Sequence, residues 1–193
     1  MIDAKKLQQR LGLTADGIIG RDTMRALFAR FGAAPERASE LGLAANVHFR
    51  DFAILDTPLR LAHFMGQCAH ESGGFRYMEE IASGAAYEGR KDLGNIVAGD
   101  GRRFKGRGPI QLTGRANYRT YGRAIGIDLE SHPEIVAHPS LGLLVGCKYW
   151  ADHGLNALAD ADDLMRITRK INGGTNGLSD RRVLTAKAKE LIL

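Results

Sequence analysis

The sequence has little cysteine, with only Cys68 and Cys147 among its 193 residues. Two cysteines do not build the disulfide framework of a small secreted domain, and both lie in apolar, helix-like stretches where buried free thiols are common. Long apolar runs are absent too, and none approaches the roughly 20 residues of a membrane-spanning helix. The start, Met1 to Lys6, has no apolar stretch after its charges, so no signal peptide is expected. We therefore expect a reduced protein made in the cytoplasm, which needs a separate release step to reach any target outside it.

Motifs for several common functions are also absent. The chain carries a net charge of +5, but its Lys and Arg residues are scattered and no nucleic-acid-binding motif gathers them. Gly106-x-Gly108 is not followed by the Gly-Lys-Ser/Thr of a phosphate loop. His70-Glu71 begins like the zinc-protease pattern HExxH, but the fifth position is Gly74, so no metal site is expected. The positive charge instead suits an anionic polymer such as the bacterial cell wall.

Strand signals are few, which favours a mainly α fold. Apolar residues make up 44% of the chain, enough for a hydrophobic core. Apolar periodicity predicts helices over residues 35–47, 58–71, 114–125, 140–153, 160–171 and 179–192. Residues 83–108 have no periodicity and hold seven glycines in 26 positions, and a loop of this length inside a compact domain is more often functional than filler. A turn and short strand at 104–113 predict a small β element beside that loop.

The first 33 residues form a unit of their own in the sequence. Two short amphipathic helices flank the turn Asp16-Gly17, and so few residues can bury only a few side chains. The pattern of Leu, Gly and Asp residues here resembles the peptidoglycan-binding helical module of many cell-wall hydrolases, although it is shorter than the usual module. We therefore divide the chain into a wall-binding-like motif at 1–33, packed on the rest, and a main domain at 34–193. An ordinary helical hairpin is the alternative.

The predicted helix at 58–71 is the centre of the main domain. Thr57-Pro58 supplies its start, because a hydroxyl caps the first turn and proline at the first helical position loses no hydrogen bond. Gly73-Gly74 supplies its end, so Glu71 lies at the C-terminus, which is the negative end of the helix dipole. A carboxyl group that must hold a proton, such as a general acid, suits this place. The alternative is an ordinary solvated Glu at a helix end.

Glycoside hydrolysis needs a second carboxyl group, which acts as base or nucleophile. Glu80 follows Glu71 by nine residues, across the double glycine, so the two can face each other but cannot share one helix face. A wide separation of the two carboxyl groups predicts inversion at the sugar carbon, and a short one predicts retention. Glu79 and Glu88 compete with Glu80 for this role, and the residues alone leave the choice open.

Four segments together resemble glycoside hydrolase family 19, which contains plant and bacterial chitinases and a branch of phage endolysins. The segments appear in the family's order and the resemblance covers roughly residues 58–185; they are 69–74 (AHESGG), 104–113 (FKGRGPIQLT), 117–118 (NY) and 171–174 (INGG). The run YEGRKDLGN at 87–95 and the absence of the plant-type cysteines resemble the phage and prophage branch.

The resemblance implies a lysozyme-like α+β fold with two lobes and an active-site cleft beside the small β element. It implies that Glu71 is the general acid, that Glu80 activates water in an inverting reaction, and that the Thr113 hydroxyl helps to hold that water. It assigns Gln111, Asn117 and Asn172 to binding the sugar and Arg181 to ordering the acidic network. We add two candidates from the residues themselves: Tyr87, whose ring can stack on a sugar, and His70, for which a core or supporting role is the alternative. One departure matters: the chitinases carry a Glu near position 176, where this chain has Asn176, which cannot hold Arg181 by charge.

These observations predict an endolysin-type glycosidase that cuts β-1,4 bonds between the amino sugars of bacterial peptidoglycan and so leads to lysis of a host cell. A chitinase acting on N-acetylglucosamine polymers and a non-catalytic wall-binding protein are the alternatives. We expect no cofactor and no nucleic-acid partner, a monomer as the working state, and action at the cell wall after release through a separate membrane-permeabilising protein.

Overall fold

The computed structural model describes all 193 residues, Met1–Leu193, and is mainly helical, as predicted. None of its helices has the length and apolar character of a membrane span. Ten α-helices and three short 3-10 helices make up the fold: α1 (Ala4–Leu11), α2 (Arg21–Phe31), α3 (Pro35–Asp51), α4 (Pro58–Glu71), η1 (Ala85–Tyr87), η2 (Lys91–Leu93), α5 (Asp100–Arg103), α6 (Arg115–Ile125), η3 (Pro133–Ala137), α7 (Pro139–Asp152), α8 (Leu155–Asp160), α9 (Leu164–Asn172) and α10 (Leu178–Ile192).

The helix predicted at 58–71 is confirmed to the residue, but the single helix predicted at 160–171 is wrong. Two helices occupy this region instead, because α8 ends at Asp160 and α9 begins only at Leu164. Asp162 lies between them with φ of +55°, a left-handed conformation that stops a helix. The side chain of Asp163 then accepts a hydrogen bond from the Arg166 N–H and caps the new helix. The acidic run at 160–163 is therefore a helix break with a cap.

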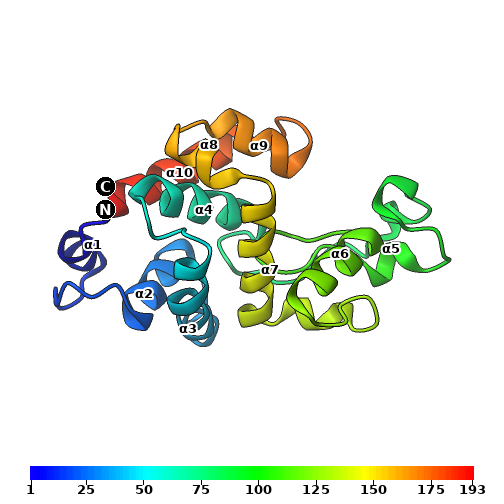
Figure 1. The fold of residues 1–193 in the computed structure, drawn as a ribbon, viewed down its shortest axis with the longest axis horizontal. Helices are drawn as coiled ribbons and strands as arrows, with labels where there is room; N and C mark the ends of the chain where they lie inside the picture. The colour runs from blue at the N-terminus through cyan, green and yellow to red at the C-terminus, as the bar shows by residue number, and fades with distance from the viewer.

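The hydrophobic core has two parts, which correspond to two lobes (Figure 1). The large part holds 31 buried residues, most of them from α1–α4 and α7–α10, including Phe49, Phe64 and Trp150. The small part holds seven, from residues 104–145, including Phe104 and Tyr118. Helix α7 contributes to both parts and runs between the two lobes in Figure 1. The Glu71 end of α4 belongs to the large lobe, and the glycine-rich segment belongs to the small lobe. The candidate site residues therefore come from both lobes and from distant parts of the chain.

Residues 1–33 share the large core with the rest of the chain. Phe28 on α2 packs edge-on against Phe75, with 4.9 Å between ring centroids, and at 6.2 Å from Phe49 on α3. The Lys6 ammonium donates to the Leu193 carbonyl oxygen over 2.8 Å, so α1 meets the end of α10. The two termini accordingly lie side by side in Figure 1. These helices are packed on the main domain; their role in wall binding stays a prediction.

The β structure is small, as expected, and lies next to the glycine-rich segment. Arg107 forms antiparallel bridges with Glu79 on one side and Leu112 on the other. The Gly108 N–H donates to the Met78 carbonyl over 2.8 Å, which extends the first bridge. These bridges hold residues 78–80 against residues 106–112, so that two of the predicted motifs are adjacent in space.

Candidate active site

Glu71 is the last residue of α4, and the chain turns away from it at once. The Thr57 hydroxyl caps the start of the helix by accepting from the Arg60 N–H, as the sequence predicts. At the other end, the Ser72 hydroxyl donates to the Cys68 carbonyl over 2.6 Å and accepts from the Phe75 N–H over 2.9 Å. This buried serine holds the turn after the helix, so the Glu71 side chain, 19% exposed, stays at a defined place at the surface of the large lobe.

The side chain of Arg181, on α10, binds Glu71. Its guanidinium is fully buried and donates to the Glu71 carboxylate over 2.5 Å and to Gln67 Oε1 over 2.6 Å. Its Nε donates to the backbone carbonyl of Asn176 over 3.4 Å. The sequence analysis noted that Asn176 cannot hold Arg181 by charge; the structure shows that position 176 contributes its backbone instead. The negative end of the α4 dipole is therefore not the only charge beside Glu71, because the buried Arg181 guanidinium contacts the Glu71 carboxylate directly.

Gln67 is a site residue that the sequence analysis missed. It is completely buried, lies one turn before Glu71 on the same face of α4, and gives Arg181 a neutral acceptor. The spacing in the sequence could have indicated this role. An amide four residues before a functional carboxylate on one helix can bind the same hydrogen-bond donor as that carboxylate. Spacing alone did not show that this partner comes from a helix 114 residues away.

His70 is tied to α10. Its Nδ1 lies 2.5 Å from a carboxylate oxygen of Asp180, and the ring lies against Gly177, where a Cβ atom would come within 2.4 Å of the imidazole. Only glycine, at φ of +70°, fits at that position. No group of three or more His, Cys, Asp or Glu side chains in the structure could hold a metal ion. His70 thus packs α4 against the start of α10, and nothing in the structure tests its assignment to sugar binding.

Glu80 lies on the other lobe, at the small β element. One carboxylate oxygen accepts from the Tyr87 hydroxyl over 3.1 Å, and the other accepts from the Gly106 N–H over 3.1 Å. The backbone of Glu80 is held as well, because its N–H donates to the Gly106 carbonyl and its own carbonyl accepts from the Lys105 ammonium. Both oxygens therefore have neutral donors, and no cation pairs with the side chain of Glu80.

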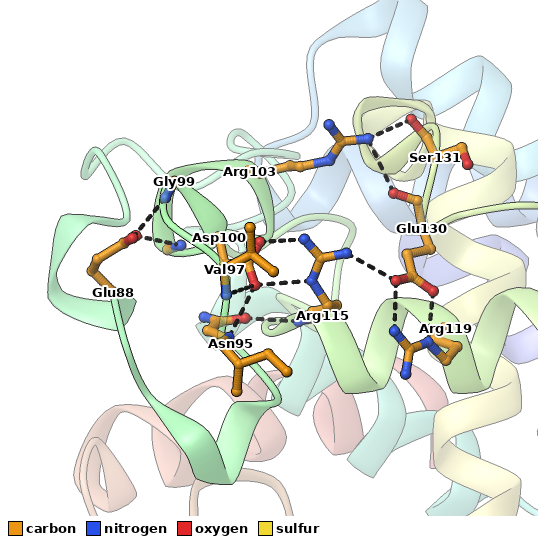
Figure 2. Close-up of polar contacts among 12 residues, drawn as sticks. Glu88, Asn95, Val97, Gly99, Asp100, Arg103, Arg115, Arg119, Glu130 and Ser131 are labelled. Atoms are coloured by element: carbon orange, nitrogen blue, oxygen red, sulfur yellow. Dashed lines mark hydrogen bonds and ion pairs between the residues drawn. The ribbon is translucent and has the colours of Figure 1, made fainter.

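The two competing carboxylates have structural partners. Glu79 forms ion pairs with Arg107, at 2.9 Å, and with Lys105, at 3.5 Å. Glu88 accepts from the N–H groups of Gly99 and Gly101 over 2.6 and 2.8 Å (Figure 2). These hydrogen bonds join two parts of the glycine-rich segment. Glu79 is therefore neutralised by cations, and Glu88 binds backbone N–H groups of its own segment. Glu80, which has no cationic partner and accepts from Tyr87 and Gly106, is the best placed of the three for the second role.

Tyr87 connects the two candidate catalytic carboxylates. Partial burial raises the pKa of its hydroxyl, and the negative charges of Glu80 and then of Glu71 raise it further. An effect from both side chains means that both lie within electrostatic range of one hydroxyl group, although they come from different lobes. The Glu71 charge also adds to the effect of burial in raising the pKa of Tyr149 on α7, to about 12. Glu71 and Glu80 therefore both act electrostatically on the Tyr87 hydroxyl, and their catalytic roles stay a prediction.

Gln111 and Thr113 lie beside Gly106, on the segment that holds Glu80. A Cβ atom on Gly106 would come within 2.6 Å of Gln111 Oε1 and 3.3 Å of Thr113 Oγ1. The Thr113 hydroxyl donates to the Gln111 carbonyl over 2.9 Å, and Asn117 Nδ2 donates to the Thr113 carbonyl over 2.7 Å. Gln111, Thr113 and Asn117 are thus linked to one another next to Glu80.

Asn172 is less closely connected. It is the last residue of α9 and is exposed, and no hydrogen bond joins it to either carboxylate. The segment that follows it does reach the site, because Asn176 contacts Arg181 and Gly177 contacts the ring of His70. The structure therefore places the motif at 171–174 at the edge of the large-lobe half of the site.

Comparison with known proteins gives a consistent family. The family model described as "Chitinase class I", of glycoside hydrolase family 19, matches residues 56–153. A family 19 domain-containing protein of Haemophilus influenzae is 31% identical, over 64% of this chain and 75% of its own length. An endochitinase of Arabidopsis thaliana is 30% identical, over 72% of this chain, but the match spans only 54% of that protein.

Solved structures agree with this result. A bacterial family 19 chitinase superposes with a TM-score of 0.70 at 25% identity, covering 86% of this chain and 93% of its own. A class IV family 19 chitinase from Zea mays superposes with a TM-score of 0.67 at 24% identity, covering 86% and 90%, which supports the fold alone. The predicted lysozyme-like fold of this family is confirmed.

Proposed function

The chain belongs to glycoside hydrolase family 19, and from this premise we propose that it hydrolyses β-1,4 bonds between the amino sugars of bacterial peptidoglycan. The observation that carries the proposal is the pair of carboxyl groups from two lobes, Glu71 and Glu80. Glu80 accepts from the Tyr87 hydroxyl, and the charges of both carboxylates raise the pKa of that hydroxyl. Glycoside hydrolysis requires such a pair, with different surroundings for each member. Here Glu71 contacts a buried guanidinium, whereas Glu80 is held by a hydroxyl and a backbone N–H.

In the proposed reaction Glu71, in its protonated form, gives its proton to the glycosidic oxygen as the bond from that oxygen to the sugar carbon breaks. Glu80 takes a proton from a water molecule, and the resulting hydroxyl group bonds to the sugar carbon from the opposite face, which inverts its configuration. Glu71 is left ionised and Glu80 protonated, and exchange with solvent restores both. Arg181 keeps the Glu71 carboxylate in place and stabilises the negative charge that forms on it.

The neighbours of Glu80 supply the polar contacts. The Thr113 hydroxyl donates to a carbonyl but can still accept, so we assign it to holding the attacking water. The amides of Gln111, Asn117 and Asn172 can donate to and accept from sugar hydroxyl and acetamido groups. These four assignments come from the family resemblance, and the linkage of Gln111, Thr113 and Asn117 beside Glu80 supports three of them.

Two observations favour peptidoglycan as the substrate. The net charge of +5 suits an anionic wall. The motif at 1–33, which resembles a wall-binding module, has an ordered centre: buried Gln8 donates to Asp16 and to the Ile18 carbonyl and accepts from the Gly17 N–H. With this substrate the protein acts as an endolysin, reaching the wall after a separate protein has permeabilised the membrane.

Chitin is the second candidate substrate. It is favoured by the names of several relatives, which are endochitinases of Arabidopsis thaliana and other plants. Both polymers contain β-1,4-linked N-acetylglucosamine, so the same two carboxyl groups serve either reaction. The difference between them lies in the sugar-binding side chains and not in the acid and base.

One experiment separates these functions. Purified peptidoglycan and chitin oligomers are digested in parallel, the fragments are identified by mass spectrometry, and the anomeric configuration of the new reducing ends is followed by NMR. We expect muropeptide fragments with inverted configuration, and the Glu71→Gln variant, at equal folded concentration, to release none. Cleavage of chitin alone would replace the endolysin proposal by the chitinase. Wall binding without cleavage, unchanged in Glu71→Gln, would mean a non-catalytic wall-binding protein.

A further inference from the structure

The segment at 83–103 is ordered without a hydrophobic core of its own. None of its apolar side chains is buried, and Ile96 and Val97 are 74% and 55% exposed. Its buried side chains are polar: Asn95 is completely buried and Asp100 is 1% exposed. Since burial of apolar area cannot order this segment, its hydrogen bonds and ion pairs must do so.

Asp100 and Arg115 form the centre of this network (Figure 2). Arg115, the first residue of α6, binds both oxygens of Asp100 with two nitrogens of its guanidinium. The same carboxylate accepts from the N–H groups of Ile96 and Val97, each over 3.0 Å. Hydrogen bonds from Arg115 and the N–H of Val97 hold the pKa of Asp100 below its usual range in spite of its burial. One buried carboxylate thus attaches the turn at 96–97 to the second lobe.

Arg115 is anchored in turn from its other side. Its Nη1 donates to Glu130 over 2.9 Å, and its guanidinium lies 4.7 Å from the centre of the Phe104 ring. Glu130 also accepts from Arg119. The hydrogen bonds from Arg119 and Arg115 lower the pKa of Glu130 to about 2. The Arg115 guanidinium is therefore fixed by Glu130 and Phe104 of the small lobe, which lie outside the segment at 83–103.

A second connection leads from Arg115 to the site. The backbone N–H of Arg115 donates to Asn95 Oδ1 over 2.9 Å. Asn95 Nδ2 in turn donates to the backbone carbonyl of Tyr87 over 2.9 Å. Tyr87 then donates its hydroxyl to Glu80. Three successive hydrogen bonds therefore join Arg115 to the carboxylate to which we assign the activation of water.

We propose that the Arg115–Asp100 pair is a positioning device for Glu80: it orders residues 87–100 so that Tyr87 presents its hydroxyl to the Glu80 carboxylate. Neither member of the pair contacts Glu80 itself. The inference rests on the proposed function for its effect on catalysis, but the ordering of the segment is a property of the fold alone.

The test uses Asp100→Asn, which preserves the shape of the side chain and removes the charge. Asp92→Asn is its matched control, because Asp92 lies in the same segment and also pairs with an arginine, Arg90. Both of these side chains are exposed, and neither hydrogen-bonds to α6. We expect Asp100→Asn to lower kcat about tenfold with KM within about twofold of wild type, and Asp92→Asn to change neither. Because a loss of folded enzyme would also lower the apparent kcat at unchanged KM, the variants are compared at equal folded concentration, and the double-mutant cycle below separates a positioning role from a merely structural one.

A double-mutant cycle with Tyr87→Phe tests the route. If the pair acts through Tyr87, Asp100→Asn should lower kcat by less than about twofold when it is introduced into the Tyr87→Phe variant, which lacks the hydroxyl. Amide hydrogen exchange, measured by NMR, supplies a readout that needs no activity: exchange at Ile96 and Val97 should accelerate in Asp100→Asn while the amides of α4 remain protected.

Additive losses in the cycle, or unchanged exchange at Ile96 and Val97, would overturn the inference, as would a loss of protection throughout the protein. If the wild type cleaves neither peptidoglycan nor chitin, the proposed function fails. In that case the exchange experiment still decides whether Asp100 orders the segment.

Discussion

The buried guanidinium of Arg181 has one acidic partner, and that partner is Glu71. Its other two acceptors are neutral, the Gln67 side chain and the Asn176 backbone. The family 19 chitinases that the sequence resembles carry a Glu near position 176, where this chain has Asn. As a result the charge of Arg181 is balanced by the proposed catalytic acid itself, which couples the position of Glu71 to the packing of α4 against α10.

This relationship predicts that Arg181→Lys damages both stability and activity. A lysine ammonium cannot match the planar fork that reaches three separate acceptors, so at least one buried acceptor loses its partner. We expect unfolding by urea to become easier by about 2 kcal/mol and kcat to fall at least about tenfold. Arg182→Lys, at the next and exposed position of α10, is the control and should leave both unchanged. Full activity in Arg181→Lys would show that the fork does not hold Glu71.

The neighbouring acidic residues Glu79 and Glu80 should separate by substitution. Glu80→Gln should lower kcat at least about 100-fold with little change in stability, because its carboxylate has no cationic partner and is assigned to the reaction. Glu79→Gln should keep kcat within a few-fold but lose about 1 kcal/mol of stability, since it breaks the pair with Arg107. Steady-state kinetics and urea unfolding of each variant measure these effects, and the reverse pattern would assign the second carboxyl role to Glu79.

Local sequence patterns predicted much of this molecule. The helix ending at Glu71 was predictable because its cap, its apolar stripe and its glycine end are all local signals. The motifs shared with the family also named Glu71 and Glu80. In the structure Glu80 accepts from the Tyr87 hydroxyl, and both charges raise the pKa of that hydroxyl. The helix break at Asp162 was missed because a left-handed aspartate has no strong local signature.

Partners that depend on tertiary contacts were not predictable. Nothing in the spacing of Gln67 and Arg181, 114 residues apart, shows that they share a buried hydrogen bond. In the same way the sequence left Glu79, Glu80 and Glu88 as equals. They differ only through what folding brings to them, a guanidinium for Glu79, a hydroxyl for Glu80 and two backbone N–H groups for Glu88.

Stability should fall as the pH is lowered, and His63 should contribute. Its ring is fully buried, and burial lowers its pKa more than Asp162 raises it, with Lys189 lowering it and Asp163 raising it slightly. The native state therefore binds fewer protons than the unfolded state, in which a histidine titrates near pH 6.5, so stability is lost as the pH falls through that value.

The measurement is urea unfolding of wild type and His63→Gln at pH 7.5 and pH 5.5. We expect wild type to lose about 1 kcal/mol more than the variant over this interval. His48, whose pKa is also lowered by burial, is present in both proteins and cancels in the comparison. The lowered pKa of Asp162 acts near and below pH 4, outside the interval. His132→Gln, at an exposed position, is the control, and an equal loss in wild type and His63→Gln would contradict the assignment.

The shared core predicts that residues 1–33 are required for folding, whatever they bind. Phe28 is completely buried against Phe75 and Phe49, which lie outside these residues. Phe28→Ala should therefore cost about 3–5 kcal/mol, as in any well-packed core, and unfolding should remain a single transition by fluorescence and circular dichroism. Ile18→Ala, in the same unit but 67% exposed, should cost less than about 0.5 kcal/mol. A separate early transition in Phe28→Ala, with the rest of the protein still folded and active, would mean that the first two helices are an independent module; a single transition means that wall binding and catalysis cannot be separated by deleting them.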